Sequence, residues 1–286
     1  MVSDNELDLF LRSRRDAVTP ASLGLPAGTR RRAPGLRRSE LALLSGISVE
    51  YLTRLEQGRD RRPSPEVLAA LADTLRLTPS ERVHLYRLTK AADPGFACMG
   101  SAPVRRTVRP AVRAVLDHLD PAPAALFDRT GEVLACTDGY RSLMAPSGLF
   151  DEDNGGHLAW YVFADPRARE LYPDWPQVAD HWVATLKEGP FRGNPDVARL
   201  AEQLTVVAGA EFTRRVNTVP GLPAASGVTR MEHPEVGSLR LAYETLDLSA
   251  DDAQRLVVHL PADAASATAL DRLAGRHPGG LRAVPG

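Results

Sequence analysis

The chain has 286 residues, of which 43% are hydrophobic and 25% charged, so we expect a globular protein of two domains and exclude a disordered or fibrous chain. It contains no run of about 18 apolar residues and no apolar signal-peptide core near its N-terminus, which predicts a cytoplasmic protein without a membrane span. The two cysteines, Cys98 and Cys136, form no CxxC pair, which argues against a disulfide framework and a cysteine-based zinc site.

The formal net charge of −1 conceals an uneven distribution. Residues 1–92 carry 16 basic and 11 acidic side chains, whereas the rest of the chain carries 19 and 25. Residues 30–62 alone contain nine arginines against four acidic residues. Such a region is either a solvated basic face or the binding surface for a polyanion, and charge by itself does not separate the two.

The first ninety residues predict a compact all-α bundle of five short helices. The first helix spans about residues 5–17, and a loop rich in glycine, proline and arginine follows it. Two short helices then flank Gly46. The fourth and fifth begin after the caps Ser64 and Thr78, each followed by proline, a residue favoured in the first helical turn.

Changes in composition predict the domain boundaries. Residues 93–110 are rich in proline, glycine and other small residues and are predicted to be a linker. It separates an N-terminal domain at 1–92 from a second domain at 111–262. Residues 263–286 show weak periodicity and are predicted to be a flexible tail.

The second domain mixes helical and strand patterns, which predicts an α+β fold with about five strands. One helix is expected at 108–119, and a β-hairpin at 124–138 turns at residues 128–131. The sequence HPEVG lies between two alternating segments, so it predicts a second hairpin whose turn His233 supports, and RLVVHLPA predicts a fifth strand. Further helices are expected at 166–171, 176–187, 195–207 and 210–217.

The stretch LALLSGISVEYLTRLEQG, residues 41–58, predicts a helix-turn-helix. Ala42 is small enough for close helix crossing, Gly46 tolerates the positive φ of the turn, and Ser48 caps the second helix. This pattern resembles the XRE/lambda-repressor-like helix-turn-helix domains. In that superfamily a Ser or Thr usually caps the first helix, where this chain has Arg37, so that turn must be capped in another way.

A wider resemblance covers about residues 7–260. The segments RRRAPGLRRSELALLSGISVEYLTRLEQGR, FADPRARELYPDWPQVA and HPEVGSLRLAYETL are similar to the MmyB-type transcriptional regulators. The resemblance implies an XRE-like DNA-binding domain followed by a PAS-like domain that holds fatty-acid-like molecules. It therefore implies a cytoplasmic, nucleoid-associated transcription regulator.

The start of the second helix is expected to face base edges in the major groove. There Arg54 is predicted to contact guanine, Glu50 cytosine and Val49 a thymine methyl group. Glu50 has the alternative role of stabilising the helix dipole, and Arg54 the alternatives of a phosphate contact or a pair with Glu50. The predicted base contacts are Ser48, Val49, Glu50, Thr53 and Arg54.

Seven arginines are predicted to contact phosphates: Arg30, Arg31, Arg32, Arg37, Arg38, Arg59 and Arg61. For the first three, which lie on a loop with glycine and proline, insertion into a minor groove is the alternative. Because one short helix reads few base pairs, we expect a homodimer on a palindromic operator in double-stranded DNA.

The second domain is expected to bind a small apolar ligand that shifts the operator affinity. The predicted pocket residues are Phe127, Cys136, Tyr140, Phe163, Trp182, Phe212 and Tyr243, and the alternative for each aromatic residue is a place in the core. An arginine, Arg141, Arg167 or Arg169, is a candidate partner for a ligand carboxylate, although surface pairs are an alternative for the last two. The other interpretation of the whole chain is a ligand-free regulator controlled by a protein partner.

No catalytic motif supports an enzyme: GxSxG, GxxxxGK, GxGxxG and HExxH are absent. We expect no catalytic residues, no metal site and no cofactor apart from the fatty-acid-like ligand. The scattered histidines are interpreted as core or surface residues. Cys136 is interpreted as a buried apolar group, with thiol sensing as the alternative.

Overall fold

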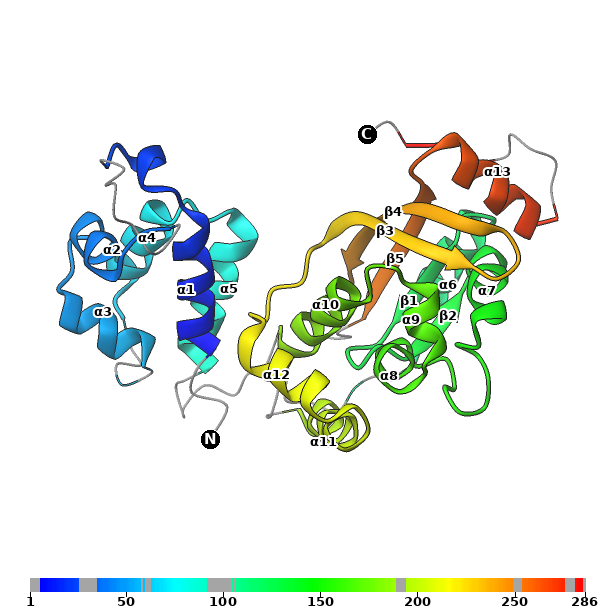
Figure 1. Cartoon of the computed structure of the whole chain (residues 1–286), viewed down its shortest axis with the longest axis horizontal. Coiled ribbons are helices and arrows are strands. Elements are labelled where there is room, and N and C mark those ends of the chain that lie inside the picture. Colours follow the sequence, from blue (N-terminus) through cyan, green and yellow to red (C-terminus); the bar gives the residue numbers. More distant parts are fainter. Residues whose placement is uncertain are drawn as a thin grey trace. The chain divides into compact units, whose positions relative to one another are not determined.

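The computed structural model describes residues 6–25, 35–57, 59, 63–91, 104, 106–188, 194–248, 254–275 and 281–284. The chain divides into two compact units (Figure 1). The N-terminal unit comprises Met1–Cys98 with Lys187–Arg192 and Val216–Leu222, and the C-terminal unit comprises the remaining residues.

The N-terminal unit is helical, as predicted. Its elements are α1 (Glu6–Ala17), a 3₁₀ turn η2 (Pro20–Leu23), α2 (Arg38–Leu44), α3 (Val49–Glu56), α4 (Pro65–Thr74) and α5 (Pro79–Ala91). Each helix is short and amphipathic, so its stability comes from burial of one apolar face. The faces meet in one core formed by Phe10, Leu11, Val18, Leu36, Leu41, Ala42, Leu52, Leu55, Leu71, Ala72, Leu75, Leu77 and Leu85.

Glu40 caps the start of α2, where the sequence has no Ser or Thr. Its Oε2 accepts a hydrogen bond from the backbone N–H of Arg37 at 2.8 Å. A carboxylate in the first turn also stabilises the positive end of the helix dipole. The helix therefore starts at Arg38 without a hydroxyl cap.

The C-terminal unit has the predicted α+β fold. Its helices are α6 (Pro110–Leu119), α7 (Asp138–Met144), α8 (Leu158–Ala164), α9 (Arg167–Leu171), α10 (Trp175–Lys187), α11 (Pro195–Ala208), α12 (Ala210–Thr218) and α13 (Ala264–Leu273), with a 3₁₀ turn η4 (Ala145–Ser147). The last residue of α10 and the last three of α12 are assigned to the N-terminal unit. Its strands are β1 (Ala124–Phe127), β2 (Val133–Cys136), β3 (Ser226–His233), β4 (Gly237–Asp247) and β5 (Arg255–Pro261). The strands form an antiparallel sheet in the order β2-β1-β5-β4-β3 (Figure 1).

Strand register divides the side chains of this sheet between two faces. Leu126 of β1 pairs with Leu256 of β5 on the first face, which packs against Val112 and Leu116 of α6. On the second face, Ala125 pairs with Cys136 of β2 and with Val257 of β5. Two residues after Val257, His259 therefore lies on the same second face, and it pairs with Tyr243 of β4.

The hairpin β3–β4 turns at the predicted HPEVG segment. His233 pairs with Gly237, and its Nδ1 accepts a hydrogen bond from the backbone N–H of Glu235 at 3.1 Å. Because Nδ1 is the acceptor, Nε2 of the neutral ring is left to donate to the carbonyl of Leu143 at 3.0 Å. His233 thus supports the turn and joins it to α7.

Three helices of the C-terminal unit were not predicted. α7 and α8 have seven residues each, and α8 (LAWYVFA) is almost entirely apolar, so neither shows a clear amphipathic period. The prediction of a flexible tail from residue 263 is wrong at α13, which packs against β4, β5 and α7. Its buried face consists mostly of alanine and serine, which give little hydrophobic contrast in a sequence.

Candidate DNA interface and ligand site

The turn between α2 and α3 requires a residue with positive φ. Gly46 has a φ of +66°, its N–H donates to the carbonyl of Leu43 at 3.2 Å, and the N–H of Ile47 donates to that of Ala42 at 3.0 Å. These two bonds form a Schellman motif. Since no heavy atom lies within 4 Å of a Cβ built on Gly46, backbone conformation rather than crowding favours glycine here.

The helix that follows presents the predicted base-contact residues on one side. The Ser48 Oγ accepts a hydrogen bond from the backbone N–H of Tyr51 at 3.0 Å and so caps α3. Its neighbours Val49 and Glu50 are exposed, and one turn later Arg54 is exposed as well. The half-buried Thr53 donates its hydroxyl to the carbonyl of Val49 at 2.8 Å.

Arg54 and Glu50 do not pair with each other. The Arg54 guanidinium lies 5.9 Å from the ring centroid of Tyr51, and in the part of the chain that the structure describes no ion pair joins it to Glu50. Both charged groups therefore point to solvent from the exposed side of α3.

Arg38, a predicted phosphate contact, forms an ion pair with the buried carboxylate of Glu56. Its Nε lies 2.5 Å from Glu56 Oε2; the Glu56 side chain is 1% exposed and that of Arg38 is 40% exposed. Burial raises the pKa of Glu56, and the charge of Arg38 acts in the opposite direction. The pair joins the start of α2 to the end of α3. Its two residues are 18 positions apart in the chain, so no local sequence pattern predicts that they pair.

The other predicted phosphate contacts divide into two groups. Arg37 and Arg59 are exposed. Arg30, Arg31, Arg32 and Arg61 lie outside the described residues.

In the C-terminal unit, six aromatic side chains contact one another in a closed ring, which we call the aromatic ring cluster. Adjacent ring centroids are 5.9–6.5 Å apart, in the order Phe127, Trp182, His181, Tyr243, His259, Tyr140 and back to Phe127. Strands β1, β4 and β5 contribute three members, and helices α7 and α10 contribute the others. The cluster therefore lies between the second face of the sheet and the helices that cover it.

Four of the seven predicted pocket residues belong to this cluster, and Cys136 lies on the same face of the sheet. The remaining two, Phe163 and Phe212, contact each other at 5.2 Å between ring centroids in a second aromatic group with Trp175. The structure thus divides the predicted residues between two places. The sequence does not indicate His181 and His259 as pocket residues, because a histidine on a helix or strand carries no signal for a pocket by itself.

The three candidate arginines have partners within the protein. Arg167 pairs with Asp151 and Asp165, each at an N–O distance of 2.8 Å or less. The Arg169 guanidinium lies 3.7 Å from the ring centroid of Trp175, and that of Arg141 lies 5.0 Å from the ring centroid of Phe150.

Two members of the aromatic ring cluster carry buried polar atoms without a hydrogen-bond partner among the described residues. They are the Oη of Tyr140, a residue 1% exposed, and the Nδ1 of His259. Burial raises the pKa of Tyr140 and lowers that of His259 to about 4, so both groups are uncharged at neutral pH. Burial also raises the pKa of the Cys136 thiol, which does not favour the reactive thiolate that thiol sensing requires.

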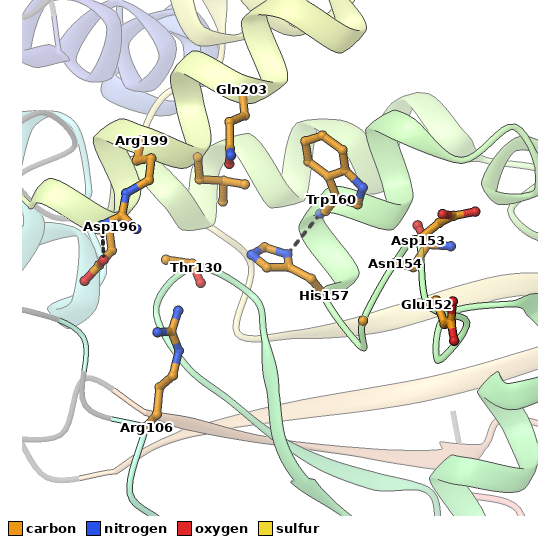
Figure 2. Close-up of a pocket in the computed structure, with 12 residues that line it drawn as sticks. Arg106, Thr130, Glu152, Asp153, Asn154, His157, Trp160, Asp196, Arg199 and Gln203 are labelled. Carbon is orange, nitrogen blue, oxygen red and sulfur yellow. Dashed lines mark hydrogen bonds and ion pairs between the residues drawn. The ribbon is translucent and has the colours of Figure 1, made fainter.

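A polar cavity of about 310 Å³ lies elsewhere in the unit (Figure 2). Its walls are the segment before α6, the turn between β1 and β2, the loop before α8, the start of α8 and one side of α11. The lining residues are Arg106, Thr130, Glu152, Asp153, Asn154, Gly155, His157, Trp160, Asp196, Arg199, Leu200 and Gln203. Arg199 pairs with Asp196 at 2.8 Å, and Arg106 pairs with Glu132 at 2.8 Å. These charges are largely balanced within the protein, and none of the predicted pocket residues lines this cavity.

His157 caps α8 at the wall of this cavity. Its Nδ1 accepts a hydrogen bond from the backbone N–H of Trp160 at 3.1 Å, as Figure 2 shows, so the proton of the neutral ring lies on Nε2. Burial lowers the pKa of His157, and the nearby carboxylates of Asp128 and Glu132 act in the opposite direction.

Within the described ranges, no group of three or more His, Cys, Asp or Glu side chains is placed to hold a metal ion. No helix in the same ranges is long and apolar enough to cross a membrane.

Comparison with known protein families gives two matches. Residues 108–273 match the ligand-binding domain of MmyB-like transcription regulators, and residues 9–85 match a helix-turn-helix domain. The first match covers more than half of the chain and includes α13. No curated protein matches the chain.

Proposed function

Because the chain belongs to the MmyB-like transcription regulators, we propose that α3 reads a specific operator and that an apolar, fatty-acid-like ligand in the C-terminal unit modulates this binding. A helix-turn-helix domain followed by an MmyB-like ligand-binding domain is the organisation of a ligand-modulated transcription regulator. The base-reading residues, the class of ligand and the number of chains per operator go beyond these two family matches.

The observation that supports α3 as the reading helix is its exposed N-terminal side after the Gly46 turn. Arg54 presents a planar donor for the two acceptors of guanine, and Glu50 an acceptor for the cytosine amino group. Val49 is 42% exposed and offers a methyl contact to thymine. Each good pair contributes about 1–3 kcal/mol of discrimination between bases.

Two copies of the chain are proposed to bind a palindromic operator. An eight-residue helix contacts only a few base pairs, so a second copy is needed for specificity. The exposed Arg37 and Arg59 are proposed to hold the backbone phosphates.

The ligand is proposed to act by shifting a population of conformers. It changes operator affinity only if it binds differently to the DNA-competent and the DNA-incompetent states. The side chains of the aromatic ring cluster are largely apolar, and such side chains are the usual lining of a site that binds an acyl chain.

The test is a fluorescence anisotropy titration on a DNA site selected by the purified protein from a random library. Arg54→Ala is expected to lower affinity for the selected site by about 5- to 150-fold and to change non-specific binding little. Arg87→Ala is the matched control, because it removes the same charge from an exposed position on α5. Equal losses in the two variants would contradict reading by α3.

A second arm adds a long-chain fatty acid to protein stripped of lipid. The lipid is expected to change operator affinity by at least about fivefold, a typical coupling between two sites. If affinity does not change, the fatty-acid part of the proposal is wrong and control by a protein partner becomes the better explanation.

A further inference from the structure

The polar cavity drawn in Figure 2 has a volume of about 310 Å³, and none of its lining residues belongs to the aromatic ring cluster. Figure 2 shows the charged side chains of its wall in two separate groups. Arg106, Arg199 and Asp196 lie on one side of the cavity, and Glu152 and Asp153 lie on the other. The two sides differ in how their charges are balanced.

On the first side, each arginine already has a carboxylate partner. Arg199 Nη2 lies 2.8 Å from Asp196 Oδ1. Arg106 Nε lies 2.8 Å from Glu132 Oε2 and 3.7 Å from Oδ2 of Asp128, whose side chain is fully buried. An anionic ligand placed here would compete with these carboxylates and be repelled by them. This side of the cavity therefore does not favour a carboxylate or phosphate ligand.

On the second side, the charges of Glu152 and Asp153 are not compensated. Both side chains are exposed, and within the described part of the chain no ion pair joins either of them to a basic residue. His157 adds no positive charge at neutral pH, because burial lowers its pKa. The whole wall carries three carboxylates and two guanidinium groups, so the cavity has a net negative charge.

Asn154 adds an acceptor atom that the protein does not use. Its side chain lines the cavity and is 4% exposed. The Nδ2 group donates to the carbonyl of Gly148 at 3.0 Å and to Asp165 Oδ2 at 2.7 Å, which accounts for both amide protons. The Oδ1 atom has no partner among the residues that the structure describes. Because buried polar atoms are nearly always paired, this oxygen favours a ligand that donates hydrogen bonds.

We propose that this cavity binds a small organic cation with primary ammonium groups, such as an aliphatic diamine. An ammonium group has three donors and no acceptor, so it can donate to Asn154 Oδ1 and pair with Glu152 or Asp153. Trp160 lines the same cavity, and the face of an indole ring attracts an ammonium group. The inference assigns a second site in this domain and does not rest on the proposed function.

The experiment compares three ligands with the same carbon chain on the purified full chain, by isothermal titration calorimetry at neutral pH. Cadaverine is a dication, pentanediol is uncharged and glutarate is a dianion. Cadaverine is expected to bind at least about tenfold more tightly than pentanediol, and glutarate is expected not to bind. Mg²⁺ has the same charge as cadaverine and is also expected not to bind, because no group of metal ligands is placed for it among the described residues.

The variant that tests the site combines Glu152→Gln with Asp153→Asn, and it is expected to weaken cadaverine binding about tenfold. Its matched control combines Asp117→Asn with Glu235→Gln, which removes the same charge from exposed positions that do not line the cavity. The control is expected to leave cadaverine binding unchanged. All four side chains are exposed, so these variants test binding without a change in the core.

A third variant, Trp160→Leu, is expected to weaken cadaverine binding about fivefold through loss of the cation–π contact.

The inference is overturned if cadaverine does not bind, or if pentanediol or glutarate binds as tightly. Equal losses in the cavity variant and its control would also overturn it, because they indicate unselective attraction to an acidic surface. Binding of Mg²⁺ with the affinity of cadaverine would lead to the same conclusion. The measurement uses neither DNA nor lipid, so its failure leaves the proposed function intact.

Discussion

At the scale of single residues, Glu56 connects the two helices of the helix-turn-helix through a charge that is removed from water. Its carboxylate is 1% exposed, and Arg38 is the cation paired with it. Burial raises the pKa of Glu56, so the folded state binds a proton at this site more strongly than the unfolded state does. The contribution of this carboxyl to stability therefore decreases as the pH rises through its folded-state pKa.

Arg38→Ala is expected to destabilise the N-terminal unit by about 2 kcal/mol at neutral pH, because it leaves the Glu56 carboxylate buried without a cation. Without Arg38 the pKa of Glu56 rises further. The deficit should consequently shrink as the pH is lowered and the carboxyl takes up a proton. Urea unfolding of wild type and variant at several pH values measures both effects.

Arg82→Ala is the control for this prediction. Arg82 pairs with Asp73, but these side chains are 42% and 70% exposed, so the pair contributes no more than about 1 kcal/mol. Its effect should be small and nearly independent of pH over the same range. A deficit in Arg38→Ala that grows as the pH falls would contradict the assignment of a buried carboxylate.

At the scale of elements, α13 closes the C-terminal unit although its sequence is rich in small residues. Ser266 accepts a hydrogen bond from the backbone N–H of Arg240 in β4 at 2.8 Å. Leu270 is 3% exposed and is the largest apolar side chain that the helix buries. These contacts make α13 part of the folded unit.

Leu270→Ala is expected to lower the free energy of unfolding of the C-terminal unit by about 2–4 kcal/mol, through lost burial and a residual cavity. Thr268→Ala, two residues earlier on the exposed side of the same helix, should change it by less than about 0.5 kcal/mol. Thermal unfolding followed by calorimetry measures both. Equal stability of the two variants would show that α13 is not packed in solution.

At the scale of the whole molecule, the uneven charge distribution fits a protein in which only one of the two units binds DNA. The basic side chains concentrate in residues 30–62, while the chain as a whole has a net charge of −1. A basic surface on an otherwise acidic protein limits attraction to polyanions to one region. Affinity for DNA should accordingly fall steeply as salt is added.

The proposed dimer makes a geometric prediction about the operator. Two half-sites should be centred about 34 Å apart, one helical turn of DNA, or a multiple of it. Scrambling one half-site is expected to reduce binding toward the non-specific level, by about 10³-fold or more. Sedimentation of the complex should give two chains per intact site. One chain per site with unchanged affinity for a single half-site would contradict the dimer.

The amino-acid sequence by itself determined the features that depend on residues close together in the chain. The turn at Gly46, the cap Ser48 and the proline starts of α4 and α5 follow local rules of backbone geometry and hydrogen bonding. The hairpin at His233 and the all-α and α+β classes follow from the same short-range periodicity.

Only the tertiary structure decided which distant residues meet. Three contacts join segments that sequence periodicity does not relate: the ion pair of Arg38 with Glu56, the ring contact of Tyr140 with His259, and the packing of α13 against the sheet. The physical reason is that the spacing of apolar residues along a helix or strand shows which of its sides is buried. The residues that contact that side depend on the packing of the whole unit.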